Sequence, residues 1–114
     1  MAVRMDKAWQ PLTEERVSQL PGHLGVFQLG DADGNVVYIG CADARTRYGL
    51  REVVGAQLSA PAADATCFRT ESTMAYRTRF AELVQAYLHD HGRPPAGNTD
   101  LDPSQFGRLR PLGG

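Results

Sequence analysis

The sequence GVFQLGDADGNVVYIG, from Gly25 to Gly40, decides the fold of this chain. The stretches 26–29 and 36–39 are short runs of mainly β-branched, aromatic and other apolar side chains, which favour a pleated and half-buried strand. Residues 31–35 between them read DADGN, and such residues make turn hydrogen bonds or tolerate a positive φ angle. The stretch therefore predicts a β-hairpin with a loop of about five residues.

The sequence on either side of the hairpin predicts helices and a further strand. Residues 13–20 begin with a threonine that can cap a short helix. Apolar residues at helical spacing predict a second helix over 48–58, and residues 65–70 predict a third strand. The longest helix is expected over 73–91, with a buried stripe that comprises Met74, Phe80, Leu83, Val84, Tyr87 and Leu88. The fold class is therefore α+β, with a small three-stranded, mainly antiparallel sheet flanked by helices.

Length and composition indicate one domain. The 114 residues are enough for a single core. We place this domain at residues 1–98, including an N-terminal lead-in, and an irregular Pro- and Gly-containing tail at residues 99–114. No apolar run approaches the roughly 20 residues that span a bilayer, so no membrane partner is expected. The N-terminal residues lack an apolar signal segment, which favours a cytoplasmic protein.

Charge and cysteine content exclude few functions. The net charge is −1, so no overall positive field indicates a nucleic-acid partner. Lys7 is the only lysine among the 12 basic residues, and arginine forks suit phosphate and carboxylate groups. Composition alone favours the simpler interpretation, a codon or composition bias of the host. Cys41 and Cys67 have neither metal-site nor disulfide spacing and are expected to be free thiols, with Cys41 the better candidate for a functional one.

The hairpin also carries a family resemblance. Residues 25–27, GVF, and residues 38–40, YIG, resemble the paired tripeptides of the GIY-YIG nuclease superfamily. The features that follow have the family's order: an arginine-rich segment, a strand, a longer helix, then Pro and Asn. The resemblance covers about residues 20–98 and implies the GIY-YIG fold. In that family the activity is metal-assisted phosphodiester cleavage.

The resemblance assigns the first site residues one by one. Tyr38 matches the second motif tyrosine and is a catalytic candidate. Phe27 stands where the first tyrosine belongs, so one hydroxyl is missing and its role is limited to binding. Arg51 best matches the helix arginine that stabilises phosphate charge, while Arg45 and Arg47 are alternatives for that role and candidates for binding.

The family's metal-binding glutamate has no direct counterpart. Its usual place falls on Met74, and a thioether does not hold a hard divalent cation. Glu71 is the nearest substitute and Glu82 a second one, although a glutamate beside a helix N-terminus is also favoured by the helix dipole. Asn98 resembles the family's closing asparagine. Mg²⁺ or Mn²⁺ is therefore expected only if nuclease activity is retained, and no metal ligand is assigned.

These residues predict a cleft of arginine and tyrosine side chains that binds DNA, RNA or another phosphate-bearing ligand, with nuclease activity weak or lost. Arg69, Arg77 and Arg79 are further contributors. Two alternatives stay open: the scaffold binds or acts on an anionic small molecule, or it is a protein-interaction module. A symmetric homodimer, in which a second chain supplies missing groups, is also open.

Overall fold

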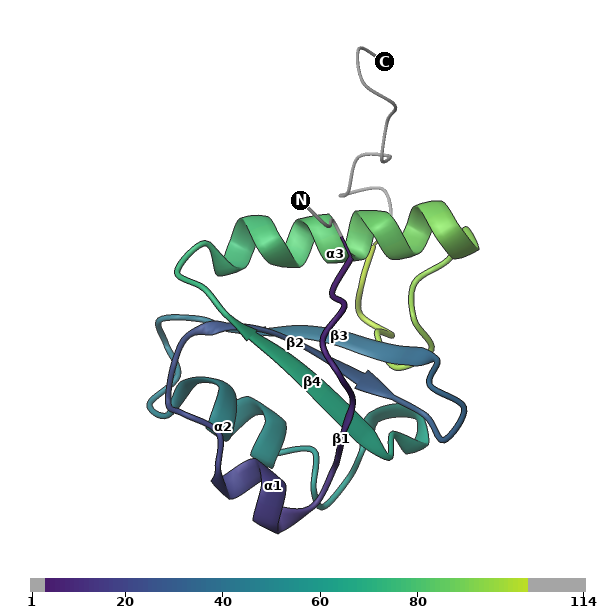
Figure 1. Cartoon of the computed structure of the whole chain (residues 1–114). Helices are drawn as coiled ribbons and strands as arrows, with labels where there is room; N and C mark the ends of the chain where they lie inside the picture. Colours follow the sequence, from purple (N-terminus) through teal and green to yellow (C-terminus); the bar gives the residue numbers. More distant parts are fainter. Residues whose placement is uncertain (1–3, 103–114) are drawn as a thin grey trace.

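The domain is built on a four-stranded antiparallel sheet (Figure 1). The computed structural model describes residues 4–102. The strands are β1 (Gln10–Pro11), β2 (Gly25–Gly30), β3 (Val36–Ala42) and β4 (Cys67–Ser72), and they lie in the order β1-β4-β2-β3. The predicted α+β class and antiparallel sheet are therefore confirmed, with β1 added as a fourth strand.

Strands β2 and β3 form the predicted hairpin, and Asp31 closes its loop. The Asp31 carboxylate accepts hydrogen bonds from the backbone N–H groups of Asp33 and Asn35, both at 2.9 Å. Gly34 follows with φ 81°, a left-handed conformation that glycine adopts without steric cost. The local residue types thus determine the turn, as the sequence indicates.

Helices cover both faces of the sheet (Figure 1). Helices α1 (Glu14–Ser18) and α2 (Gly49–Gly55) lie on one face, here called the α2 face, and the long helix α3 (Tyr76–His91) lies on the other, the α3 face. A short 3₁₀ turn, η1 (Ala62–Asp64), precedes β4. The Thr13 hydroxyl accepts a hydrogen bond from the N–H of Arg16 and caps α1, as predicted.

Each face of the sheet has its own apolar core because side chains alternate along the strands. On the α2 face the fully buried side chains include Leu29, Leu50, Val54 and Phe68. On the α3 face they include Val26, Ile39, Leu83 and Val84, with the buried Met5 of the N-terminal segment.

Strand β1 was expected only as an extended lead-in. Gln10 and Pro11 pair with Phe68 and Cys67 of β4, and the N–H of Leu12 donates to the carbonyl oxygen of Thr66. A two-residue strand has too little periodicity to be seen in a sequence, and Pro11 is tolerated because β1 is at the edge of the sheet.

The start of α3 and the position of Met74 correct the prediction. The helix begins at Tyr76 rather than at residue 73, and its N-cap is Ala75. Met74 lies in the turn before the helix, where its side chain is 78% exposed. The prediction that Met74 belongs to the buried stripe of α3 is wrong, because this residue lies in the turn between the end of β4 and the start of the helix.

The segment after α3 returns to the outer edge of β3 (Figure 1). Gly92, with φ 73°, ends the helix, and the N–H of Gly97 donates to the carbonyl oxygen of Val37 at 2.7 Å. Leu101 then packs against the α3-face core. Residues 103–114 of the predicted tail lie outside the described residues.

Candidate functional site

The two motif glycines have structural reasons to be glycine. A Cβ atom on Gly25 would lie 2.2 Å from the carbonyl oxygen of Glu71, and one on Gly40 would lie 2.5 Å from the ring of Phe27 and 2.9 Å from that of Tyr38. The two rings pack over the Gly40 backbone with their centroids 5.7 Å apart. Close packing of the hairpin therefore accounts for both glycines without a catalytic role.

The two aromatic residues of the motif differ in access. Phe27 is only 3% exposed and belongs to the α2-face core, so its ring supports Tyr38 rather than forming a binding surface. Tyr38 is half-buried beside a cavity of about 320 Å³ at the outer edge of β3, which Arg45 and Asn98 also line. Burial raises the pKa of the Tyr38 hydroxyl, so this group holds its proton at neutral pH.

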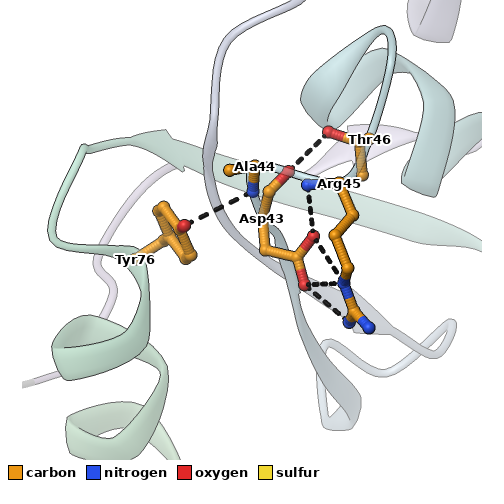
Figure 2. A network of polar contacts seen from close by, with 5 residues as sticks. All are labelled: Asp43, Ala44, Arg45, Thr46 and Tyr76. Atoms are coloured by element: carbon orange, nitrogen blue, oxygen red, sulfur yellow. Dashed lines mark hydrogen bonds and ion pairs between the residues drawn. The ribbon is translucent and has the colours of Figure 1, made fainter.

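The loop between β3 and α2 is fixed by its own hydrogen bonds, some of which Figure 2 shows. All five backbone N–H groups of residues 44–48 have acceptors within the domain. The acceptors are the Tyr76 hydroxyl, the side chain and carbonyl oxygen of Asp43, and one carboxylate oxygen of Glu52, which accepts two of the bonds. The loop therefore presents its side chains from a defined backbone.

Arg45 has its counter-ion within this loop (Figure 2). Its guanidinium donates to both oxygens of Asp43, with the shortest contact at 2.8 Å. The hydrogen bonds from Arg45 hold the pKa of the Asp43 carboxyl below its ordinary value. The pair is largely solvent-exposed on the arginine side, and Arg45 contributes little unbalanced charge to the neighbouring cavity.

Arg47, Tyr48 and Arg51 form an exposed cluster at the start of α2, here called the Tyr48 cluster. The Tyr48 ring is 52% exposed, although tyrosine is usually more buried. The guanidinium carbons of Arg47 and Arg51 lie 5.6 and 6.0 Å from the ring centroid. Neither arginine has an ion pair among the described residues, so both charges are available to a ligand.

Glu71 lies on the opposite face of the sheet from this cluster. It projects toward α3, where Arg79 donates to both of its carboxylate oxygens at 2.8 and 3.2 Å. Phe68, three residues earlier on β4, belongs to the α2-face core. The structure therefore does not bring Glu71 together with Tyr38 or Arg51.

The residues present do not fit the divalent-metal site of the family. Glu71 is occupied by Arg79, and Glu82 lies beside the same guanidinium at 3.4 Å. Within residues 4–102, no group of three or more His, Cys, Asp or Glu side chains is placed to hold a metal ion. No step through a metal can be derived from this arrangement.

Asn98 has a clear structural role at the edge of the sheet. Its side-chain amide donates to the carbonyl oxygen of Ile39 and accepts from the Ile39 N–H, both at 2.9 Å. The side chain thus satisfies the exposed backbone of β3 as a neighbouring strand would. Asn98 lies beside Tyr38 and Arg45, as the family pattern implies, but its amide oxygen and one amide hydrogen are bound to β3.

The remaining basic and thiol candidates are dispersed. Arg77 lies near the ring of Tyr76, at 6.0 Å, whereas Arg69 of β4 contacts Trp9, which directly precedes β1. Cys41 and Cys67 are free, and burial raises the pKa of both thiols. A raised thiol pKa lowers the thiolate fraction, so neither cysteine is an activated nucleophile.

The sequence-predicted residues therefore divide into three places. Tyr38, Arg45 and Asn98 share the cavity at the β3 edge, Arg47 and Arg51 flank Tyr48, and Glu71 is on the α3 face. Sequence reasoning placed Tyr48 only at the start of a helix. The spacing RYGLR, with an aromatic residue between two arginines, could have indicated Tyr48 as a candidate binding residue.

Comparison with known proteins identifies only a family. Among curated proteins, no sequence matches the chain significantly. No helix within the described residues is long and apolar enough to cross a membrane. A family model described as a domain of unknown function, DUF7508, matches residues 3–90. This match spans most of the 114 residues, and the chain therefore belongs to the DUF7508 family.

Proposed function

We propose that the chain is a divergent GIY-YIG-like domain that binds nucleic acid through the Tyr48 cluster, with nuclease activity weak or lost. The observation that carries this proposal is an exposed tyrosine with two guanidinium groups near its ring, neither of which has a counter-ion among the described residues. An unpaired base stacks on Tyr48, and the flanking phosphates bind Arg47 and Arg51. The preferred ligand is a single strand, since its bases are free to stack.

The backbone beneath the cluster supports this function. Glu52 accepts hydrogen bonds from the N–H groups of both Arg47 and Tyr48, and these bonds hold the loop against the start of α2. Gly49, with φ 57°, is the first residue of α2 and packs closely against the backbone of His23. A Cβ atom on Gly49 would lie 2.3 Å from the His23 carbonyl oxygen. A preorganised site loses less conformational entropy when it binds a ligand.

The charge distribution sets the expected strength and salt dependence of binding. The chain has a net charge of −1, so attraction to phosphate is local rather than global. Two phosphate contacts on a single strand give a slope of log K against log salt of about −1.4, from about −0.7 per contact.

Three features support weak or absent cleavage. Phe27 lacks the hydroxyl of the first motif tyrosine. Burial raises the pKa of Tyr38, which disfavours the phenolate form that would accept a proton. The substitute carboxylate, Glu71, is bound to Arg79 on the other face of the sheet.

The binding test is fluorescence anisotropy with labelled 12-nucleotide single-stranded DNA and RNA and with duplex DNA, over a range of salt concentrations. The Tyr48→Ala variant should lose one stacking contact worth about 1–3 kcal/mol, or roughly 5- to 150-fold in affinity. The Arg47→Gln, Arg51→Gln double variant should bind with a salt slope near zero. Lys7→Gln removes one positive charge near β1, at the other edge of the sheet, and should bind like wild type.

The proposal fails if wild type shows no salt-dependent binding, or if the Tyr48 and arginine variants bind as wild type does. The same strands incubated with Mg²⁺ or Mn²⁺ test the second part of the proposal. Rapid metal-dependent cleavage that Tyr38→Phe abolishes would contradict weak or lost nuclease activity.

A further inference from the structure

A second cavity lies on the α3 face, away from the Tyr48 cluster. Its volume is about 690 Å³, within the range of about 300–1,000 Å³ typical of small-molecule sites. It is bounded by the C-terminal half of α3, the loop end of the β2–β3 hairpin and the N-terminal segment that crosses this face (Figure 1). Gln28 of β2 and Arg69 of β4 are among its lining residues.

Gln28 is a polar side chain in an otherwise apolar position. It is 5% exposed, and its neighbours on β2 that face the two cores are Val26, Phe27 and Leu29. Its amide oxygen accepts a hydrogen bond from Nε of Arg69 at 2.9 Å. Within residues 4–102, its amide NH₂ group has no hydrogen-bond acceptor. No buried side-chain nitrogen or oxygen among the described residues lacks a partner, so this NH₂ group is not sealed in the interior and is open to a ligand or water at the cavity wall.

The Arg69 guanidinium also lacks a full set of partners. Its Nη1 donates to the carbonyl oxygen of Lys7 at 3.2 Å, and its carbon lies 4.1 Å from the ring centroid of Trp9. It makes no ion pair with a carboxylate among the described residues, and Asp6 acts on it only from a distance. Burial lowers the pKa of Arg69, which is the sign of a partly desolvated cation.

The rest of the cavity wall adds positive charge and an apolar surface. Arg4 is neutralised by Asp90, with two hydrogen bonds at 2.6 and 2.8 Å, whereas Arg93 adds a further cation. Leu83 and Tyr87 of α3 provide an apolar wall beside these groups. The cavity thus combines amide and guanidinium donors on its sheet side with apolar side chains opposite.

We propose that this cavity binds a small organic anion, whose carboxylate or phosphate oxygens accept hydrogen bonds from the Gln28 amide and the Arg69 guanidinium. The apolar part of the molecule packs against α3. The anion supplies the acceptor that Gln28 lacks and the negative charge that Arg69 lacks. This site is independent of nucleic-acid binding, since it shares no residue with the Tyr48 cluster.

The test uses benzoate and phenyl phosphate as probes and benzyl alcohol as the neutral control, with isothermal titration calorimetry and ¹H–¹⁵N NMR on the full chain. At least one anion should bind, shifting the side-chain amide signals of Gln28 and the Nε–H signal of Arg69, and benzyl alcohol should bind about tenfold more weakly or not at all. Absence of binding by both anions, equal binding of the alcohol, or shifts confined to other residues would overturn the proposal.

Two variants give a separate test of the donors. Gln28→Glu keeps the size of the side chain and the acceptor for Arg69 but replaces the NH₂ donor by a carboxylate oxygen, so anion affinity should fall by about tenfold or more. Arg69→Lys keeps the charge without the fork and should also weaken binding. Arg77→Gln, at the other end of α3 and outside the cavity lining, should bind the anion as wild type does. Unchanged affinity in Gln28→Glu and Arg69→Lys would refute the assignment.

Discussion

The two faces of the sheet bury side chains of different character. The core of the α2 face is apolar, and the exposed aromatic and basic groups of the Tyr48 cluster lie outside it. The α3 face combines an apolar core with polar side chains from β2 and β4, among them Gln28, Arg69 and Glu71. A buried polar group needs a hydrogen-bond partner, so the partners that it has indicate whether its role is structural.

On the α3 face, the completeness of hydrogen bonding distinguishes structural residues from candidate binding residues. Glu71 and Arg79 satisfy each other through two hydrogen bonds, which is the arrangement of a structural contact. Gln28 and Arg69, one strand apart, are satisfied only in part. Polar side chains on the same face of the sheet therefore have different roles. Those whose hydrogen bonds a neighbour completes stabilise the core, and those with incomplete hydrogen bonding stay available to a ligand.

The largest expected loss of stability follows a substitution in the apolar core of the α2 face. Phe68→Ala removes a fully buried ring between β4 and the helices, and unfolding free energy should fall by about 3–5 kcal/mol. Urea denaturation followed by circular dichroism measures the change, with the exposed Tyr48→Ala as a control expected within about 0.5 kcal/mol of wild type. A smaller loss of unfolding free energy in Phe68→Ala than in Tyr48→Ala would show that Phe68 does not stabilise the core of the α2 face.

A smaller loss is expected on the α3 face. Glu71→Ala removes both hydrogen bonds that Glu71 accepts from Arg79, whose side chain is 12% exposed, so unfolding free energy should fall by about 1–3 kcal/mol. The matched variant Glu82→Ala removes a more exposed carboxylate and should cost about 0.5 kcal/mol or less. If Glu71→Ala kept full stability but abolished metal-dependent cleavage, Glu71 would be a catalytic residue and not a structural one.

The smallest expected change in stability follows a substitution in the loop of the β2–β3 hairpin. Backbone hydrogen bonds, chiefly from Asn35, lower the pKa of the Asp31 carboxyl. A carboxyl whose pKa is depressed by folding adds stability above its ordinary pKa and loses it as pH falls through the folded-state pKa. Asp31→Ala should therefore be less stable than wild type at pH 7, with a difference that narrows below about pH 4.

Thermal unfolding between pH 2 and pH 7 measures this difference. Ala32→Ser, in the same loop, leaves both carboxylates of the loop in place and is the control. A stability difference for Asp31→Ala that is independent of pH would mean that the ionised carboxylate does not close the turn.

Most of the fold could be predicted because its signals are local. The hairpin, its loop and the cap of α1 depend on residues close in the sequence, and each was found where expected. Strand β1 and the first turn of α3 were missed or misplaced. Pairing of Gln10 with Phe68 joins residues far apart in the chain, and the helix start was judged from Met74, which the turn places in solvent.

The sequence by itself determined the secondary structure of the hairpin, the α+β class and the presence of arginines near an aromatic motif, because residue type and spacing set local backbone preferences and periodicity. Only the tertiary structure decided which of these side chains meet. It separated Glu71 from Tyr38, since alternate residues on strands face opposite ways, and it paired Glu71 with Arg79. It also placed Gln28 beside Arg69, because strand pairing across the sheet sets such contacts and no local sequence pattern encodes them.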